Sequence, residues 1–310
     1  MINDDFHFSE PVRGGDMRIA VIGANGQLGH DVVRAFAQQR DEVRALTHQD
    51  IELSSLESVA ACLRATRAEV VVNTAAMHNV ESCEQQPSRA QEVNVVGARN
   101  LATATRDLGS VLIHVSTDYV FDGAKGTPYV ESDEARPLNV YGRTKLEGEQ
   151  FVQDINPEHF VLRTAALYGN HPCRAKGGQN FVDLMLRLAR ERGRVRVVDN
   201  EFTSPTATAD LARQIASLSC SDSYGLYHAT AEGSCSWYEF AREIFRMADV
   251  AVTLEVASPN EFPAKVPRPA YSVLENRKLK SQNLNLFRPW QDGLHAYLSE
   301  KQLAVARKQA

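Results

Sequence analysis

Tyr141 and Lys145 are of types and at a spacing that suit acid–base chemistry. They stand four positions apart in Tyr-Gly-Arg-Thr-Lys, and on a helix this spacing places both side chains on one face. A phenol has a pKa of about 10, and a nearby ammonium favours the phenolate and lowers that pKa. The pair can therefore deliver a proton to a carbonyl oxygen while hydride reaches the carbon. By themselves, the two residues would fit a solvated helix face better.

A hydroxyl group in the right place favours the catalytic role. Ser116-Thr117-Asp118-Tyr119 follows the apolar run Val111 to Val115, which predicts a buried strand. Thr117 then lies at the carboxyl end of that strand, where ligands bind in open α/β sheets. Its hydroxyl can bind the same carbonyl oxygen. We expect Thr117, Tyr141 and Lys145 to act together in reducing a carbonyl group.

A glycine-rich turn near the start of the chain supplies the expected hydride donor's site. Gly23-Ala24-Asn25-Gly26-Gln27-Leu28-Gly29 follows an apolar run and opens a helical pattern, the context in which this motif binds a dinucleotide pyrophosphate. A plain structural turn is the alternative. The small residues Ala75 and Ala76, after a third apolar run, suit a backbone that runs close under a cofactor. The predicted cofactor contacts here are Gly23, Asn25, Gly26, Gln27, Leu28, Gly29, Ala75, Ala76, Tyr141 and Lys145.

The second strand ends without the acid that usually binds the ribose 2′-hydroxyl. The stretch is Arg44-Ala45-Leu46-Thr47-His48, and Arg44 or His48 can meet a 2′-phosphate. NADPH is therefore favoured as the cofactor, and NADH stays possible. Arg44 and His48 would equally fit a solvated surface without a role in binding.

Alternating patterns predict an α/β fold. Apolar runs at 18–22, 42–46, 70–72, 111–115 and 160–163 predict strands. Helical patterns at 28–39, 54–67, 87–108 and 140–154 lie between them, with a capping box expected at Ser54 and Glu57. This order predicts a doubly wound parallel (Rossmann) sheet with a smaller mixed substrate-binding domain at the carboxyl end.

The predicted domain boundaries follow from a change in composition near residue 165. Residues 1–16 are expected to be a disordered leader, 17–165 a dinucleotide-binding domain and 166–302 a substrate-binding half. Within that half, about 195–230 is expected to return to the main sheet, and 303–310 to form a tail. Ser236 and Glu239 predict a capping box for one helix of this half.

Composition excludes several classes of protein. The 310 residues carry a net charge of −5, which gives no reason to expect nucleic acid as a partner. No apolar run approaches the roughly 18 residues of a membrane helix, so no membrane partner is expected. The five cysteines are scattered without metal-ligand or redox spacing, which favours reduced thiols in the cytoplasm and places no metal.

Several segments together resemble the dTDP-4-dehydrorhamnose reductase family, within the extended short-chain dehydrogenases. The likeness covers roughly Met17 to Leu298, and the motifs of the second half are the more specific ones. The segments are the glycine turn, Ser116 to Gly123, Pro137 to Lys145, Asn180 to Val182, Ser204 to Thr206, Tyr227 to Thr230, Ser234 to Phe240 and Arg268 to Leu274.

The resemblance implies reduction of the C4 ketone of dTDP-4-dehydro-6-deoxy-L-mannose to dTDP-L-rhamnose with NADPH or NADH. It implies Tyr141 as proton donor, Lys145 as its electrostatic partner and Thr117 at the ketone oxygen. It also implies a homodimer and a divalent metal such as Mg²⁺, which no ligand spacing places. Further contacts implied are Asp118, Tyr119, Asn180, Phe181 and Arg268 to the substrate, and Asp50 and Ile51 around the adenine.

One departure from the family concerns the sugar. Some members carry a tryptophan in the strand-end segment that here reads Arg163 to Gly169, so the exact hexose stays open. One alternative is another nucleotide-deoxysugar 4-ketoreductase or an epimerase. A second is a non-catalytic, NADP-binding regulatory subunit of a methionine adenosyltransferase. Arg268, a residue suited to phosphate, would equally fit a simple turn.

Overall fold

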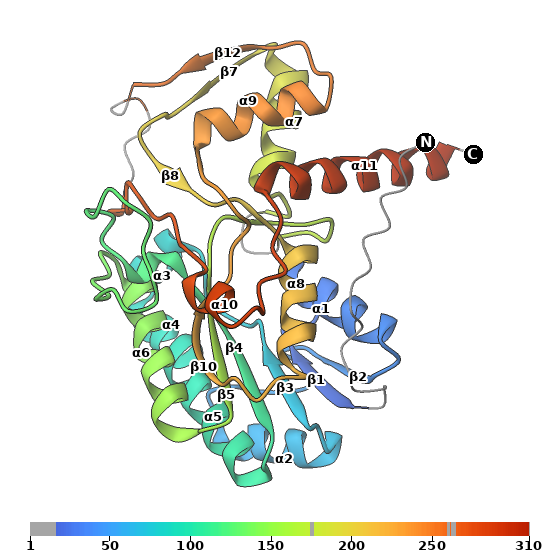
Figure 1. Cartoon of the computed structure of the whole chain (residues 1–310), viewed down its shortest axis with the longest axis vertical. Helices are drawn as coiled ribbons and strands as arrows, with labels where there is room; N and C mark the ends of the chain where they lie inside the picture. The colour runs from blue at the N-terminus through green and yellow to red at the C-terminus, as the bar shows by residue number, and fades with distance from the viewer. Residues whose placement is uncertain (1–16, 174–176, 259–260, 262–264, 310) are drawn as a thin grey trace.

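The centre of the molecule is a six-stranded parallel sheet, which confirms the predicted doubly wound fold (Figure 1). The computed structural model describes residues 17–173, 177–258, 261 and 265–309. The strand order β10-β5-β4-β3-β1-β2 places the first strand inside the sheet, with β3 on one side and β2 on the other. The strands are β1 Arg18–Ile22, β2 Glu42–Leu46, β3 Val70–Asn73, β4 Val111–Thr117, β5 His159–Thr164 and β10 Gly225–His228.

Helices cover both faces of the sheet because alternate residues of each strand point to opposite sides. In β1, Ile19 and Val21 belong to the core under one helix layer, while Ala20 and Ile22 belong to the core under the other. The first layer is α1 Gln27–Gln38 and α8 Thr208–Leu218; the second is α2 Leu56–Thr66, α5 Gly97–Leu108 and α6 Val140–Ile155.

Two predicted helix details differ from the structure. The helix expected over 87–108 is a succession of α4 Pro87–Gln91, a π-helical turn Glu92–Val96 and α5. The capping box predicted at Ser54 and Glu57 is wrong by one residue, because Ser55 is the N-cap of α2 and its hydroxyl accepts the Ser58 N–H at 3.2 Å. Neighbouring serines compete for such a role, and the sequence pattern alone does not choose between them.

A second hydrophobic core lies beyond the carboxyl ends of the strands. It forms mainly from helices α7 Phe181–Arg192, α9 Trp237–Met247 and α11 Trp290–Gln309, drawn above the sheet in Figure 1. The predicted capping box of α9 is confirmed. The short elements around it are α3 Val80–Gln85, β6 Leu167–Tyr168, β7 Arg194–Val197, β8 Phe202–Thr203, β9 Thr206–Ala207, β11 Cys235–Ser236, β12 Thr253–Val256, α10 Arg277–Ser281 and the 3₁₀ turn Asp118–Val120.

The predicted halves, 17–165 and 166–302, do not form two separate units in space. Strand β10 pairs with β5 in the main sheet, and α8 packs against α1, so part of the second half lies with the first. Residues 303–309, expected to be a separate tail, continue α11. The leader expected at 1–16 lies outside the described residues.

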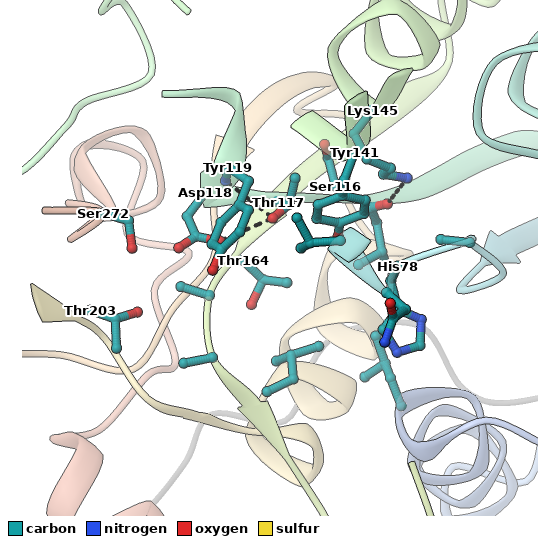
Figure 2. Close-up of a pocket in the computed structure, with 18 of the residues that line it drawn as sticks. His78, Ser116, Thr117, Asp118, Tyr119, Tyr141, Lys145, Thr164, Thr203 and Ser272 are labelled. Carbon is teal, nitrogen blue, oxygen red and sulfur yellow. Dashed lines mark hydrogen bonds between the residues drawn. The ribbon is translucent and has the colours of Figure 1, made fainter. Parts of the chain in front are cut away.

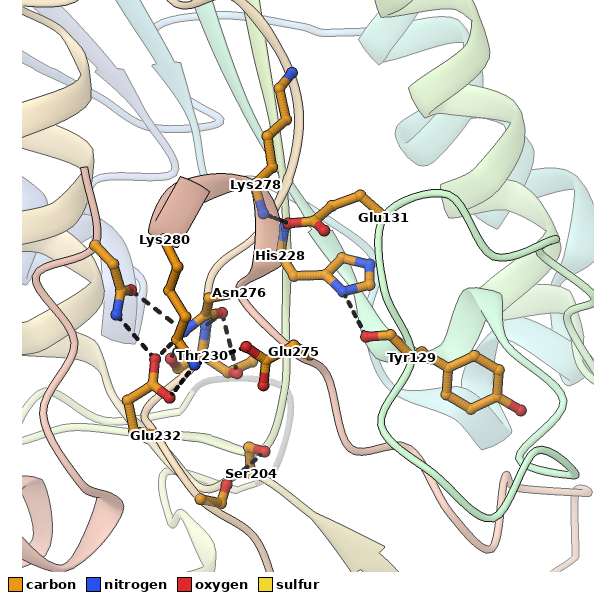
Figure 3. Close-up of polar contacts among 12 residues, drawn as sticks. Tyr129, Glu131, Ser204, His228, Thr230, Glu232, Glu275, Asn276, Lys278 and Lys280 are labelled. Atoms are coloured by element: carbon orange, nitrogen blue, oxygen red, sulfur yellow. Dashed lines mark hydrogen bonds and ion pairs between the residues drawn. The ribbon is translucent and has the colours of Figure 1, made fainter. Parts of the chain in front are cut away.

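A polar network attaches the edge strand β10 to the C-terminal segment (Figure 3). Glu131 accepts the backbone N–H groups of His228 and Lys278, each at 3.1 Å. His228 Nδ1 lies 3.0 Å from the Tyr129 carbonyl oxygen, to which it must donate. Asn276 donates to the carbonyl oxygen of Thr230 at 2.7 Å. The network satisfies buried polar groups at a sheet edge that would otherwise be exposed.

We predict that His228 makes the fold sensitive to acid. Burial lowers the pKa of His228 from 6.5 to about 3, so the unfolded chain takes up a proton that the folded chain refuses. The stabilisation is complete above pH 6.5 and falls on acidification, by about 2 kcal/mol at pH 5. His228→Asn should flatten the dependence of the urea midpoint on pH between 7 and 5. His48→Asn, at an exposed position, is the control and should leave it unchanged; equal slopes in both variants would contradict this prediction.

Candidate functional site

The carboxyl ends of the central strands open into one cavity of about 320 Å³. Its lining comes from the first turn of α1, the segment after β3, the end of β4 and the start of α6. The second half of the chain contributes Phe202, Trp237 and Arg268. Figure 2 shows Thr117, Tyr141 and Lys145 together on this lining. The structure therefore gathers residues that lie far apart in the sequence.

The glycine turn leaves the N-terminus of α1 free for an anion. Gly26 is the N-cap and no side chain caps the helix, whose first turn holds no acid. Gly23 has a φ of +79°, and a Cβ on Gly29 would stand 2.2 Å from the Gly23 carbonyl oxygen. Only glycine permits this close turn. The exposed N–H groups and the helix dipole favour a phosphate, so these residues fit a dinucleotide.

The start of α6 is pressed against the end of β4. The side chain of Asn139 caps α6 by accepting the Gly142 N–H at 2.9 Å. A Cβ on Gly142 would stand 2.2 Å from the Tyr119 carbonyl oxygen, so any other residue would push the helix away. This contact brings Tyr141 beside Thr117, and their side chains hydrogen-bond. Thr117 also donates to Asp118 at 3.0 Å.

Lys145 is buried, with 2% of its surface exposed. Its Nζ donates to the Val115 carbonyl oxygen at 2.8 Å and lies 3.1 Å from Nε2 of His114. Burial lowers the pKa of Lys145 to about 8. Burial also raises the pKa of Tyr141, against the opposing effect of the Thr117 hydrogen bond. The pKa of the Tyr141 phenol is thus raised, and not lowered as the residue spacing predicts, because desolvation is the largest effect on it.

Asp118 and Tyr119 lie on the side of Tyr141 that faces away from Lys145 (Figure 2). Burial raises the pKa of Asp118 to about 6, although hydrogen bonds from Ser272 and Thr117 oppose the rise. The ring of Tyr119 meets that of Tyr141 edge to face, with centroids 5.9 Å apart. Arg268 is at the cavity too, where it forms an ion pair with Glu81. These three predicted substrate contacts all line the cavity.

Other predicted residues lie off the lining. Asn180 caps α7 and donates to the Gly169 carbonyl oxygen and the Tyr297 hydroxyl, each at 3.0 Å. Phe181 packs on Trp237 with ring centroids 4.5 Å apart, and it is Trp237 that reaches the cavity. Asp50 accepts the backbone N–H and the hydroxyl of Thr47, both at 2.8 Å.

The remaining predicted residues stay near the glycine turn and β3. Ile51 is buried in the core under α2 and α5, and Asn25 is half-buried within the turn. Ala75 donates its N–H to Asn73 at 3.1 Å, while its neighbour Ala76 lines the cavity.

Several lining residues were not predicted from the sequence. Thr203 and Ser272 reach the cavity; Ser272 belongs to the segment Arg268 to Leu274, from which only Arg268 was given a role. Cys173 and His78 face each other there, with Sγ 3.7 Å from Nε2. His114 carried a signal that was missed, since it is a polar residue in the middle of the apolar run Val111 to Val115.

Neither metal binding nor a membrane span finds support in the part of the chain that the structure describes. There, no group of three or more histidine, cysteine, aspartate or glutamate residues could hold a metal ion. Within the same described ranges, no helix is both long and apolar enough to cross a membrane. The five cysteines are free.

Comparison with known proteins agrees with this geometry. The family model described as RmlD substrate binding domain matches residues 17–303. A dTDP-4-keto-6-deoxy-D-glucose reductase of Streptomyces niveus is 39% identical over 280 residues, covering 89% of this chain and 95% of its own. A dTDP-4-dehydrorhamnose reductase of Sinorhizobium fredii is 38% identical over 275 residues, covering 85% and 90%. The crystal structure of the Bacillus anthracis dTDP-4-dehydrorhamnose reductase in complex with NADP has a TM-score of 0.87 at 34% identity, covering 92% and 99%.

A doubly wound sheet with an uncapped glycine turn, and a threonine, a tyrosine and a lysine gathered at its carboxyl edge, defines an oxidoreductase of the extended short-chain dehydrogenase class. Within that class, the chain belongs to the RmlD substrate-binding-domain family, whose model spans nearly all of it.

We predict that Asp118→Asn makes the protein more stable at alkaline pH. The folded-state pKa of Asp118, about 6, lies above the ordinary 3.8, so the buried carboxylate opposes folding progressively as pH rises between these values. Above pH 7 the amide should gain about 1–3 kcal/mol of unfolding free energy. Near pH 4 it should gain little. Urea denaturation at both pH values measures this, with exposed Asp107→Asn as control; a gain that is equal at both pH values would contradict it.

Proposed function

We propose that this protein reduces the C4 ketone of dTDP-4-dehydro-6-deoxy-L-mannose to dTDP-L-rhamnose, with NADPH as hydride donor. The observation that carries the proposal is the convergence of Thr117, Tyr141 and Lys145 on the cavity that the α1 N-terminus also faces. The family membership and the activities named for the relatives supply the substrate. The same relatives support the dTDP-rhamnose biosynthetic role.

The cofactor would lie across the first turn of α1 and the end of β3. The N–H groups of Gly26, Gln27 and Leu28 fit the pyrophosphate, and Ala76 fits the adjoining backbone. NADP in the Bacillus anthracis relative supports NADPH. Arg44 is exposed and pairs with Glu42 at 3.1 Å, so it would have to exchange that partner for a 2′-phosphate. When bound, the nicotinamide supplies hydride to the ketone carbon.

The protein's own residues handle the oxygen and the proton. Thr117 and Tyr141 hold the ketone oxygen between their hydroxyls, which polarises the carbonyl. As negative charge develops on that oxygen, the Tyr141 phenol delivers its proton. Its raised pKa keeps the phenol protonated at neutral pH and ready to donate. Lys145 in its charged form then stabilises the phenolate left behind.

The remaining lining would bind the rest of the nucleotide sugar. Asp118 and Tyr119 would contact the sugar beside its ketone. Arg268 would bind the diphosphate in exchange for Glu81, since a guanidinium matches phosphate oxygens well. Asn180 and Phe181 would act one layer behind the lining, by supporting α7 and Trp237. Asp50 and Ile51 would border the adenine.

We also propose a cellular location and an oligomeric state for the enzyme. The free thiols suit the cytoplasm. A homodimer is proposed from the resemblance, and light scattering of the purified chain tests it. A divalent metal gains no support, because the described residues provide no donor cluster.

Replacing Tyr141 by phenylalanine tests the assigned proton donor. Wild-type protein should oxidise NADPH when given the ketosugar, and Tyr141→Phe should lower kcat by about 10²–10⁴-fold with unchanged thermal stability. Tyr238→Phe, a half-buried tyrosine off the lining, should keep wild-type turnover.

Each outcome has a separate meaning. Full turnover in Tyr141→Phe would refute the proton donor. Absence of turnover in wild type with several nucleotide-linked ketosugars would refute the reductase proposal and favour the regulatory-subunit alternative.

A further inference from the structure

A buried chain of hydrogen bonds runs behind Lys145, on the side away from the cavity. Asn73 and His114 face each other in the register of β3 and β4, with Nδ2 of Asn73 3.1 Å from Nδ1 of His114. Nε2 of His114 lies 3.1 Å from Nζ of Lys145. All three side chains are at most 2% exposed. Protein atoms alone complete this chain of hydrogen bonds, so they determine which atom donates and which accepts at each contact.

The backbone sets the direction of the chain. The N–H of Ala75 can only donate, and it points to Oδ1 of Asn73 at 3.1 Å. The Asn73 amide is therefore oriented with Nδ2 toward His114, and Nδ1 of His114 must accept. Because a neutral imidazole carries one proton, that proton is on Nε2, facing Lys145.

A donor facing Nζ is compatible with a neutral amine and not with an ammonium. The neutral amine accepts from His114 and donates to the Val115 carbonyl oxygen, which satisfies both contacts. An ammonium has no lone pair and would oppose the Nε2–H. We propose, building on the proposed function, that His114 is a positioning residue that holds Lys145 as a neutral amine in the free enzyme, so that Lys145 becomes charged only as ligands bind.

Burial lowers the pKa of Lys145 to about 8, so the Nε2–H of His114 must lower it further for the amine to be neutral at pH 7. On α6, Glu149 lies one turn beyond Lys145 and favours its charged form. Arg163 on β5 binds Glu149 with two nitrogens, at 2.7–3.1 Å, and its positive charge opposes that of Glu149. β3 contributes only the neutral Asn73. The titratable groups on the cavity side are Tyr141, Asp118, Tyr119, His78, Glu81, Cys173, Glu201 and Arg268. Burial lowers the pKa of His114 well below 6.5, so it stays neutral.

The two other buried histidines should carry their proton on the opposite nitrogen. His228 and His159 each place Nδ1 against a backbone carbonyl oxygen, at 3.0 and 2.6 Å. A carbonyl accepts only, so both must be protonated on Nδ1. Figure 3 shows this contact for His228. His114 should thus differ from both, which provides an internal reference in one sample.

In this arrangement, ligand binding would change the protonation of Lys145. Ala76, which follows the backbone N–H that orients Asn73, would hold part of a bound cofactor. Its ribose hydroxyls would offer Nζ acceptors that the free cavity lacks. Lys145 can then leave His114, take a proton and stabilise the Tyr141 phenolate. The free enzyme avoids an unpaired buried ammonium, which is costly.

Nitrogen NMR of the unliganded wild-type protein tests the tautomer directly and requires no activity. Protonated and unprotonated ring nitrogens have well-separated ¹⁵N shifts, and loss of a signal in His114→Gln or His114→Asn assigns it. We expect Nδ1 of His114 to be unprotonated and Nε2 protonated, opposite to His228 and His159. A proton on Nδ1 of His114, or a charged ring at pH 7, would overturn the proposal even if the enzyme is an active reductase.

Kinetics then tests the consequence for catalysis. His114→Leu removes the donor, so the basic limb of the pH profile of kcat/KM for NADPH, which reports groups of the free enzyme, should move to higher pH. The same substitution should lower kcat about tenfold, because Nζ of Lys145 is then held less firmly. The KM for the ketosugar should change little. His114→Gln keeps one acceptor and one donor and should restore the wild-type profile. His159→Gln should leave the rate and profile unchanged. A wild-type kcat and profile in His114→Leu would overturn the proposal, whereas absence of reductase activity in wild type would refute only the proposed function.

Discussion

The site depends on the close approach of α6 to the end of β4, which buries the Lys145 amine against protein atoms. Gly142 allows the helix to touch the Tyr119 carbonyl group, and Asn139 starts the helix at that point. With the helix there, Tyr141 stands beside Thr117, and Nζ of Lys145 contacts the Val115 carbonyl oxygen and His114. A helix one ångström further away would admit water and separate the phenol from the threonine. The glycine turn, the cavity and the second core are arranged around this contact.

Much of the fold and the centre of the site were predictable from sequence. Apolar runs such as Val70 to Val72 are buried on both faces of a parallel sheet, and a half-exposed strand would alternate with polar residues instead. Tyr141, Lys145 and Thr117 were predictable because helix spacing and strand ends fix where they lie. The details that sequence reasoning did not give depend on competition between neighbouring residues or on contacts between distant segments. Ser55 caps α2 although Ser54 matched the pattern, and Asn180 uses its amide on Gly169 and Tyr297.

Electrostatics was the least predictable property of the site. The spacing of Tyr141 and Lys145 suggested a lysine that lowers the phenol pKa, yet burial raises it. The cause is the depth of the site, which sequence spacing does not reveal. A protonated tyrosine and a weakly basic lysine suit an enzyme that charges its site only when ligands bind. The cavity wall shows a similar limit, since Ala166 lines it from the end of β5 and Trp237 reaches it from another helix.

The most direct test of the proposed reduction follows hydride into the product. NADPH carrying deuterium at both C4 positions of the nicotinamide is incubated with the dTDP-4-dehydro-6-deoxy-L-sugar and the protein in ordinary water. We expect one deuterium at C4 of the product sugar and stoichiometric oxidation of the cofactor. A product with no deuterium at C4, formed without oxidation of NADPH, would contradict the reduction and indicate an epimerase instead.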